Sequence, residues 1–167
     1  MRKLFVIVCF FVAAAALGAD DPSVEEKIRS IRAQYGEIES QLKECRQVKR
    51  DLPDESAEGG ELTAYFKDAS PRKLSARFFG EIGRTLEEYY FAKDNKLMFV
   101  LRVEIHYTKP MSGVTKNKTE QRFYFADGKL IRWLNPDNKD VTADPAMPER
   151  ERELLASAQK YLEMVRR

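Results

Sequence analysis

The sequence predicts an α+β protein, an antiparallel β-meander of about six strands with a long N-terminal helix and an amphipathic C-terminal helix. Three observations support this prediction. Apolar residues recur at helical spacing near the N-terminus, alternate with polar residues through the middle, and return to helical spacing at the end. With 167 residues, of which 43% are hydrophobic and 34% charged, the chain has the size and composition of one globular domain.

The first 19 residues are expected to be a cleavable signal peptide. Arg2 and Lys3 precede an apolar run from Leu4 to Leu17, which ends in small residues. The alternative is an N-terminal membrane anchor, but the run is shorter than the ~20 residues that a spanning helix needs. We therefore expect a periplasmic or secreted bacterial protein, with no membrane partner after residues 1–19 are removed.

Residues 20–52 are expected to form the N-terminal helix. Ser23 lies three residues before Glu26, which is the spacing of a capping box. The apolar residues that follow are separated alternately by four and three positions: Val24, Ile28, Ile31, Tyr35, Ile38, Leu42 and Cys45. This stripe either lies along the sheet of a monomer, which we expect, or pairs with a second chain as a coiled coil through Val24–Cys45.

Residues 53–167 are expected to form the sheet and the C-terminal helix, in one domain with the first helix. The clearest strand spans 97–107. One face of this strand is apolar and is expected to face the core: Leu97, Phe99, Leu101, Val103, Ile105 and Tyr107. The alternate residues include Arg102, Glu104 and His106, so the opposite face is expected to be largely wet.

The strand region contains an internal repeat. Tyr89-Tyr90-Phe91-Ala92 followed by Lys96-Leu97 parallels Phe123-Tyr124-Phe125-Ala126 followed by Lys129-Leu130, with Asp127-Gly128 as a two-residue hairpin turn. A fainter copy joins Ala64-Tyr65-Phe66 to Lys73-Leu74. These hairpins, over residues 61–134, resemble those of exported bacterial proteins of unknown function, a resemblance that implies an exported domain and brings no catalytic residue with it.

The C-terminal helix is expected over residues 149–167. Its apolar residues form a broad face that could cover one side of a sheet: Leu154, Leu155, Ala158, Tyr161, Leu162 and Val165.

Composition and motifs argue against several functions. Lys and Arg total 29 against 27 Asp and Glu, a net charge of +2, so no nucleic-acid partner is expected. One histidine and two cysteines predict no metal site, and no glycine-rich phosphate loop or dinucleotide motif predicts a cofactor. No catalytic residue is assigned, although Glu87, Glu88, Glu104 and His106 could serve an alternative, a small carboxylate-dependent hydrolase.

One group of residues has the composition of an interaction surface. We expect these aromatic, apolar and arginine side chains to gather around the hairpin ends: Tyr90, Met98, Tyr124, Ile131, Trp133, Arg122 and Arg132. The alternative is that a helix covers each face of the sheet and hides this group as a second core. The expected function is thus a non-enzymatic, exported binding domain, and a further alternative is an inhibitor that presents a hairpin to an extracytoplasmic enzyme.

Overall fold

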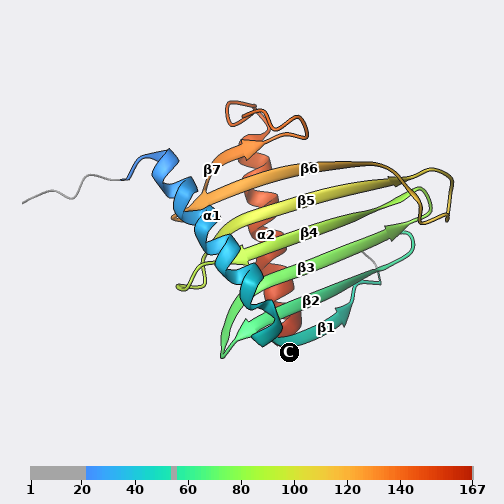
Figure 1. The fold of residues 1–167 in the computed structure, drawn as a ribbon, viewed down its shortest axis with the longest axis horizontal. Helices are drawn as coiled ribbons and strands as arrows, with labels where there is room; N and C mark the ends of the chain where they lie inside the picture. Colours follow the sequence, from blue (N-terminus) through green and yellow to red (C-terminus); the bar gives the residue numbers. More distant parts are fainter. Residues whose placement is uncertain (1–21, 54–55, 167) are drawn as a thin grey trace, which may run out of the picture.

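A single antiparallel sheet separates two helices, one packed on each of its faces (Figure 1). The computed structural model describes residues 22–53 and 56–166, so the expected signal peptide lies outside the described residues. The strands follow one another in the order of the chain. The elements are α1 (Val24–Gln41), a 3-10 turn (Leu42–Glu44), β1 (Arg46–Asp51), β2 (Gly60–Lys67), β3 (Ser70–Gly80), β4 (Gly83–Phe91), β5 (Leu97–Tyr107), β6 (Thr115–Ala126), β7 (Lys129–Leu134) and α2 (Met147–Arg166).

This architecture confirms the α+β class, with seven strands where about six were expected. The additional strand is β1, which falls inside the predicted helix 20–52. The helix instead ends at Gln41, and β1 pairs with β2 along the sheet edge. Val48 is the one apolar residue of β1 and packs against the core. The sequence of β1 therefore lacks the alternation of apolar and polar residues that predicts a strand. Backbone pairing with β2, rather than side-chain pattern, holds this segment.

The start and the buried face of α1 agree with the sequence prediction. The Glu26 amide donates to the Ser23 side chain at 3.3 Å, and the Ser23 amide donates to the Glu26 carboxylate at 2.9 Å, which completes the capping box. Ile28, Ile31 and Ile38 are buried against the protein's own sheet. The sheet of the same chain therefore covers the apolar stripe of α1 from Ile28 to Ile38, whereas Val24 at its start is exposed.

The internal repeat corresponds to three β-bulges in equivalent places. In each hairpin the register shifts within a Tyr-Phe pair, at Tyr65-Phe66, Tyr90-Phe91 and Tyr124-Phe125. The extra residues on the facing strands are Arg72, Met98 and Ile131. Tyr90 and Tyr124 belong to the cluster beneath α1, whereas the three phenylalanines belong to the cluster beneath α2.

The three bulges also show which residues are structurally equivalent in the three copies of the repeat. Pro71 pairs with Phe66 as Leu97 pairs with Phe91 and Leu130 with Phe125. The predicted equivalence of Leu74 with Leu97 and Leu130 is therefore wrong by three residues.

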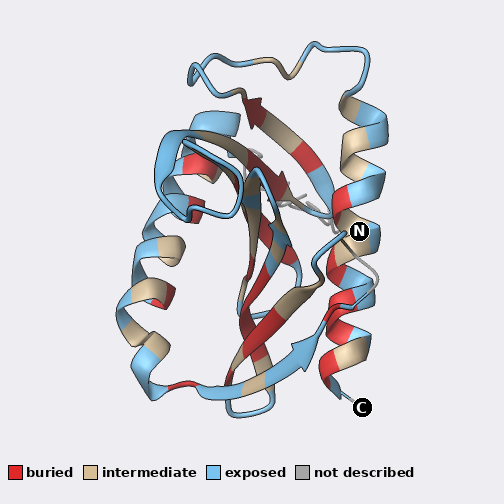
Figure 2. Cartoon of the chain, turned by 90° about the vertical axis from the view of Figure 1, so that its right-hand side faces the viewer, coloured by how far each residue is buried: buried red, intermediate tan, exposed pale blue. Residues whose placement is uncertain are grey.

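The bulge at Met98 corrects the predicted faces of strand 97–107. Leu97 and Val100 pack on the α2 side, while Met98 and Phe99 pack on the α1 side. The expected division into one core face and one wet face is wrong, because an inserted residue reverses the alternation and both faces are covered near the hairpin ends. Figure 2 shows the buried residues between the helices and the sheet.

The face of α2 that was expected to cover the sheet does so. Its buried residues are Leu154, Ala158, Tyr161, Leu162 and Val165, and Leu155 packs against the same cluster while remaining half-buried. Beyond both helices the sheet continues as the ends of β3–β6, which project to the right in Figure 1. The helices thus cover only part of each face.

Candidate functional site

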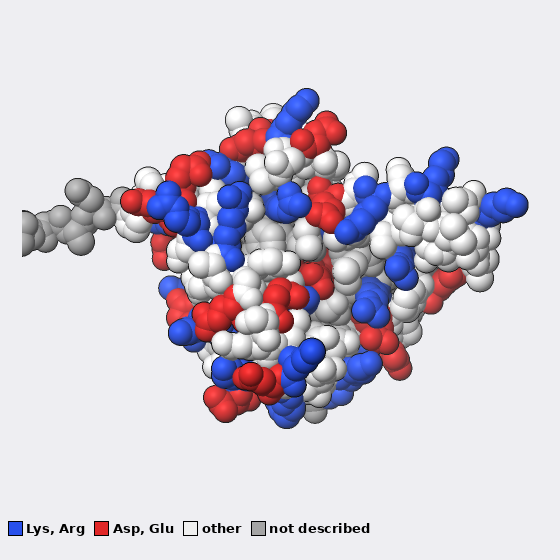
Figure 3. All heavy atoms as spheres, in the orientation of Figure 1, with Lys and Arg blue, Asp and Glu red and all other residues white. Residues whose placement is uncertain are grey.

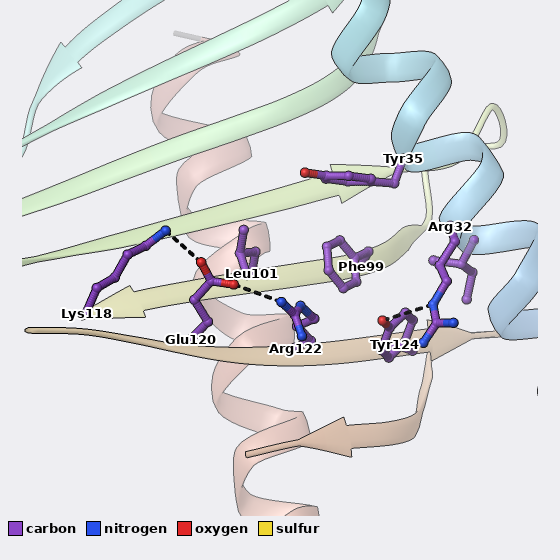
Figure 4. A pocket seen from close by; sticks show the side chains of 9 residues that line it. Arg32, Tyr35, Phe99, Leu101, Lys118, Glu120, Arg122 and Tyr124 are labelled. Carbon is purple, nitrogen blue, oxygen red and sulfur yellow. Dashed lines mark hydrogen bonds and ion pairs between the residues drawn. The ribbon is translucent and has the colours of Figure 1, made fainter. Parts of the chain in front are cut away.

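A hollow of about 470 Å³ lies on the α1 side of the sheet, where the helix leaves part of β5 and β6 uncovered (Figure 4). Its volume falls within the range typical of small-molecule sites. We call it the α1–β6 hollow, and its lining residues are Ile31, Arg32, Tyr35, Phe99, Leu101, Lys118, Glu120, Arg122 and Tyr124.

The floor of the α1–β6 hollow is aromatic and apolar. The Phe99 ring lies 5.4 Å from the Tyr35 ring and 5.0 Å from the Tyr124 ring, measured between centroids. Phe99 and Tyr124 are buried, whereas Tyr35 and Leu101 are half-buried and complete the surface. These interlocking rings are held from both sides, by α1 and by the sheet, so the floor exists before any ligand arrives.

The rim carries three cations. Lys118 and Arg122 project from β6 and flank Glu120, at 2.6 and 2.9 Å from its carboxylate oxygens. Arg122 also donates to the Asn138 side chain at 2.9 Å. Because these residues alternate along one strand, their side chains point to the same face of the sheet (Figure 4).

Arg32 differs from the other two cations. Its Nε lies 3.4 Å from the Tyr124 hydroxyl, to which it donates, and its guanidinium carbon lies 5.6 Å from the centre of that ring. Among the described residues, no carboxylate lies within 4.0 Å of this guanidinium. Arg32 therefore stands beside the aromatic floor, and no described residue pairs with its charge.

Glu120 adds one negative charge to the rim. The hydrogen bond from Lys118 holds the pKa of Glu120 below its ordinary value, against the effect of partial burial, and the charges of Lys118 and Arg122 act in the same direction. Glu120 is thus ionised at neutral pH. Three cations and one carboxylate leave the rim positive.

The predicted interaction surface does not form one exposed patch. Tyr90, Met98 and Tyr124 are buried beneath α1, and Ile131 is half-buried there. Trp133 lies in the other cluster, where its ring stacks on Phe123 at 5.6 Å. A helix packs on each face of the sheet. The bulge at Ile131 places Trp133 on the α2 side, opposite to Tyr90, Met98, Tyr124 and Ile131.

The two arginines of that predicted surface also separate. Arg132 forms ion pairs with Glu25 at 2.7 Å and Asp140 at 3.1 Å, which join β7 to α1 and to the following loop. Arg122 lies in the α1–β6 hollow. Arg122 and Tyr124 are thus the two residues of the predicted surface that the structure brings to one site.

Sequence reasoning missed most of the rim. Arg32 follows Ile31 on α1, and its sequence context does not distinguish it from the other charged residues of that helix. A usable signal was present in β6, where Lys118, Glu120 and Arg122 alternate in phase with buried Tyr124. Because these four residues occupy alternate positions of the strand, the three charged side chains lie on the same face of the sheet as the buried Tyr124.

The residues of the alternative hydrolase do not all come together, although Arg102 pairs with both Glu87 and Glu104, at 3.7 and 3.2 Å. Glu87 and Glu88 are neighbours in β4 and point to opposite faces, so Glu88 pairs with Lys73 at 2.7 Å while Glu87 lies 2.6 Å from the Tyr89 hydroxyl. Glu104 forms an ion pair with Arg102 at 3.2 Å. With the exposed His106 it also lines a shallow hollow of about 230 Å³ at the far end of the sheet.

Within residues 22–53 and 56–166, no cluster of three or more His, Cys, Asp or Glu is arranged to hold a metal ion. Neither described helix has the length and apolar character needed to cross a membrane. The chain has no match among known protein families, curated proteins or solved structures.

Proposed function

We propose that this chain is an exported binding domain whose site is the α1–β6 hollow. Its ligand is a small molecule with a flat apolar body and an anionic group. The observation that carries this proposal is the Arg32 guanidinium beside a buried aromatic floor, where it has no carboxylate partner among the described residues.

The floor supplies the apolar part of the recognition. Phe99, Tyr35 and Tyr124 meet edge to face or tilted, which leaves ring surface and the Leu101 side chain directed into the hollow. A planar ligand that removes this surface from water gains roughly 25 cal/mol per Å² of apolar area buried. The rings are already ordered by packing, so binding requires little further loss of side-chain entropy.

The rim supplies the charge preference. An anion beside Arg32 replaces water with a charge-assisted hydrogen bond and breaks no ion pair of that arginine. Lys118 and Arg122 strengthen the positive potential, although each already contacts Glu120. A cationic ligand has only Glu120 to meet it, so the hollow favours anions.

The export part of the proposal rests on residues 1–19, with their basic start, apolar run and small-residue end. An extracytoplasmic location is consistent with a domain that sequesters or senses a small amphipathic anion.

Two related fluorescent compounds test the binding site. One is 8-anilino-1-naphthalenesulfonate, and the other is N-phenyl-1-naphthylamine, which has the same aromatic skeleton without the sulfonate. We expect the sulfonate to bind more tightly, and Arg32→Gln to weaken it about tenfold while leaving the neutral compound within twofold. Arg29→Gln, an exposed arginine one turn earlier on α1, is the matched control.

Leu101→Glu provides a second test, because it places a carboxylate inside the hollow at a half-buried position. It should abolish sulfonate binding while the far-ultraviolet circular dichroism spectrum stays that of the wild type. Equal affinity of the two compounds, or equal losses in Arg32→Gln and Arg29→Gln, would contradict the proposal.

A further inference from the structure

The end of the sheet farthest from the helices exposes apolar side chains. Among the described residues, the exposed large hydrophobic side chains are Val24, Phe79, Ile82, Met111 and Val114. All but Val24 lie at this end, and Ile82, Met111 and Val114 are 67%, 70% and 60% exposed. Such a concentration on one part of a monomer marks an interaction surface more often than chance.

Two loops form this end, the β3–β4 turn at 80–83 and the β5–β6 loop at 108–114, and we call them together the distal tip. They are joined by backbone hydrogen bonds. The Met111 amide donates to the Glu81 carbonyl at 2.7 Å, and the Tyr107 amide donates to the Ile82 carbonyl at 2.9 Å. The exposed apolar residues of both loops are therefore held together as one unit.

The distal tip is also basic. Between Ile105 and Lys118 the sequence contains two lysines and one histidine but no acidic residue. Lys109 and Lys116 are exposed beside Met111 and Val114, and Arg84 is exposed after the β3–β4 turn. Figure 3 shows uncharged and basic atoms dominating this projecting end of the molecule. Glu81 is the acidic residue of the two loops.

We propose that the distal tip docks on an anionic phospholipid surface. Ile82, Met111 and Val114 enter the interface between headgroups and acyl chains, and the lysines contact lipid phosphates. Apolar side chains flanked by lysines complement such a surface in both hydrophobicity and charge. The shape favours the same partner, because projecting hairpin ends fit a deformable bilayer, whereas a protein hot spot needs a preformed pocket on its partner.

This proposal does not use the α1–β6 hollow, whose lining begins at Lys118 on β6 and continues away from the distal tip, and it replaces the expectation of no membrane partner. It leaves the hollow open to solvent while the protein is bound. An exported domain anchored in this way would encounter amphipathic anions at the membrane surface.

Vesicle flotation tests the proposal with the full chain. Vesicles of phosphatidylglycerol and phosphatidylcholine in equal parts are compared with vesicles of phosphatidylcholine alone. All variants share residues 1–21, so differences between variants report on the tip. The triple variant Ile82→Ser, Met111→Ser, Val114→Ser should lose at least about tenfold in partitioning to the anionic vesicles. Val24→Ser, at an exposed hydrophobic position away from the distal tip, should lose nothing.

The lysines are tested with a matched pair of double variants. Lys109→Gln with Lys116→Gln should weaken binding about fivefold per lysine at low ionic strength. Lys129→Gln with Lys139→Gln removes two exposed lysines elsewhere and serves as the control. Added salt should reduce the difference between the two pairs.

A Met111→Trp variant gives a readout specific to the tip. Its fluorescence should shift to the blue with anionic vesicles and should be quenched by brominated acyl chains, with wild-type Trp133 as the background. Failure of this quenching, or equal binding by the tip variants and their controls, would overturn the proposal. Binding to a polyglutamate peptide with no binding to vesicles would also overturn it and assign the tip to an acidic protein.

Discussion

Lys73 on β3 and Glu39 on α1 form an ion pair of 2.8 Å between the sheet and the helix, and the Lys73 side chain is only 7% exposed. Glu88 on β4 completes the arrangement at 2.7 Å from the same ammonium group. The Tyr90 hydroxyl lies 2.8 Å from a Glu39 oxygen and 2.9 Å from a Glu88 oxygen, so its one proton is shared between the two carboxylates. This network fixes α1 on the sheet, and the position of α1 in turn defines one wall of the α1–β6 hollow.

Lys73→Met should therefore destabilise the protein by about 3–5 kcal/mol, because it leaves two carboxylates without their cation. Urea unfolding measures the loss. Lys96→Met is the control, since its ion pair with Asp94 is 61% and 56% exposed and should contribute less than about 1 kcal/mol. Adding Glu39→Gln and Glu88→Gln to Lys73→Met should recover part of the loss. A Lys73→Met variant as stable as Lys96→Met would show that the network does not hold the helix.

The same network predicts how stability changes at alkaline pH. Burial alone would lower the pKa of Lys73, but the charges and hydrogen bonds of Glu88 and Glu39 raise it above its ordinary value of 10.5. Because the folded-state pKa exceeds the unfolded one, the contribution is complete below 10.5 and is lost as pH rises through the folded-state value. The stability difference between wild type and Lys73→Met should stay constant from pH 7 to about pH 10 and then shrink. A difference that shrinks below pH 9 would contradict this assignment.

Glu120→Gln should tighten binding of the naphthalenesulfonate to the α1–β6 hollow. The substitution removes the negative charge of the rim and frees Lys118 and Arg122 from their ion pairs. We expect an increase of about tenfold at low salt, with a smaller one at high salt. Glu104→Gln, which changes a carboxylate at the far end of β5, should leave the affinity unaltered. Weaker binding in Glu120→Gln would mean that the ligand does not lie among these cations.

Two glycines should respond to alanine in opposite directions. A Cβ at Gly36, within α1, would meet nothing within 4 Å, so Gly36→Ala should stabilise the protein by roughly 0.5–1 kcal/mol. A Cβ at Gly83 would meet the Ile105 carbonyl of the neighbouring strand, so Gly83→Ala should destabilise by about 1–3 kcal/mol. Thermal unfolding of both variants, compared with wild type, measures the two signs. A stability change of the same sign in both variants would contradict the surroundings described for one of the two glycines.

The reactivity of the Cys45 thiol tests whether α1 packs on its own sheet or on a second chain. The thiol is 9% exposed and donates to the Gln41 carbonyl at 3.6 Å. We expect its reaction with an aromatic disulfide reagent to be at least about tenfold slower in the native protein than in urea. Light scattering should give the mass of a monomer. A dimer that persists in Cys45→Ser would support the coiled-coil alternative.

The sequence predicted the elements whose local signals agree with their packing. The capping box of Ser23, the isoleucine stripe of α1 and the apolar face of α2 each encode both an element and its buried side. The turn at Asp127-Gly128 has positive φ at both residues, as the dipeptide predicts. These features depend on residues close together in the chain.

The bulges and the α1–β6 hollow were not predictable in this way. Leu97, Met98, Phe99 and Val100 are all buried, so their sequence carries no polar residue to mark where the alternation reverses. The hollow depends on where α1 crosses the sheet, which is set by contacts such as Tyr35 on Phe99 and Glu39 on Lys73. Such long-range contacts decide which part of a sheet face stays uncovered, and no local pattern records them.

Methyl-labelled NMR spectra during titration with 8-anilino-1-naphthalenesulfonate test the proposed binding site most directly. Ile31 and Leu101 line the α1–β6 hollow, whereas Leu62 is buried under α2 and Ile82 lies on the distal tip. We predict saturable shifts of the Ile31 and Leu101 methyl signals, with contacts from the aromatic protons of the ligand, while Leu62 and Ile82 remain unchanged. Saturable shifts at Ile82 or Leu62 without shifts at Ile31 and Leu101 would contradict the proposed site.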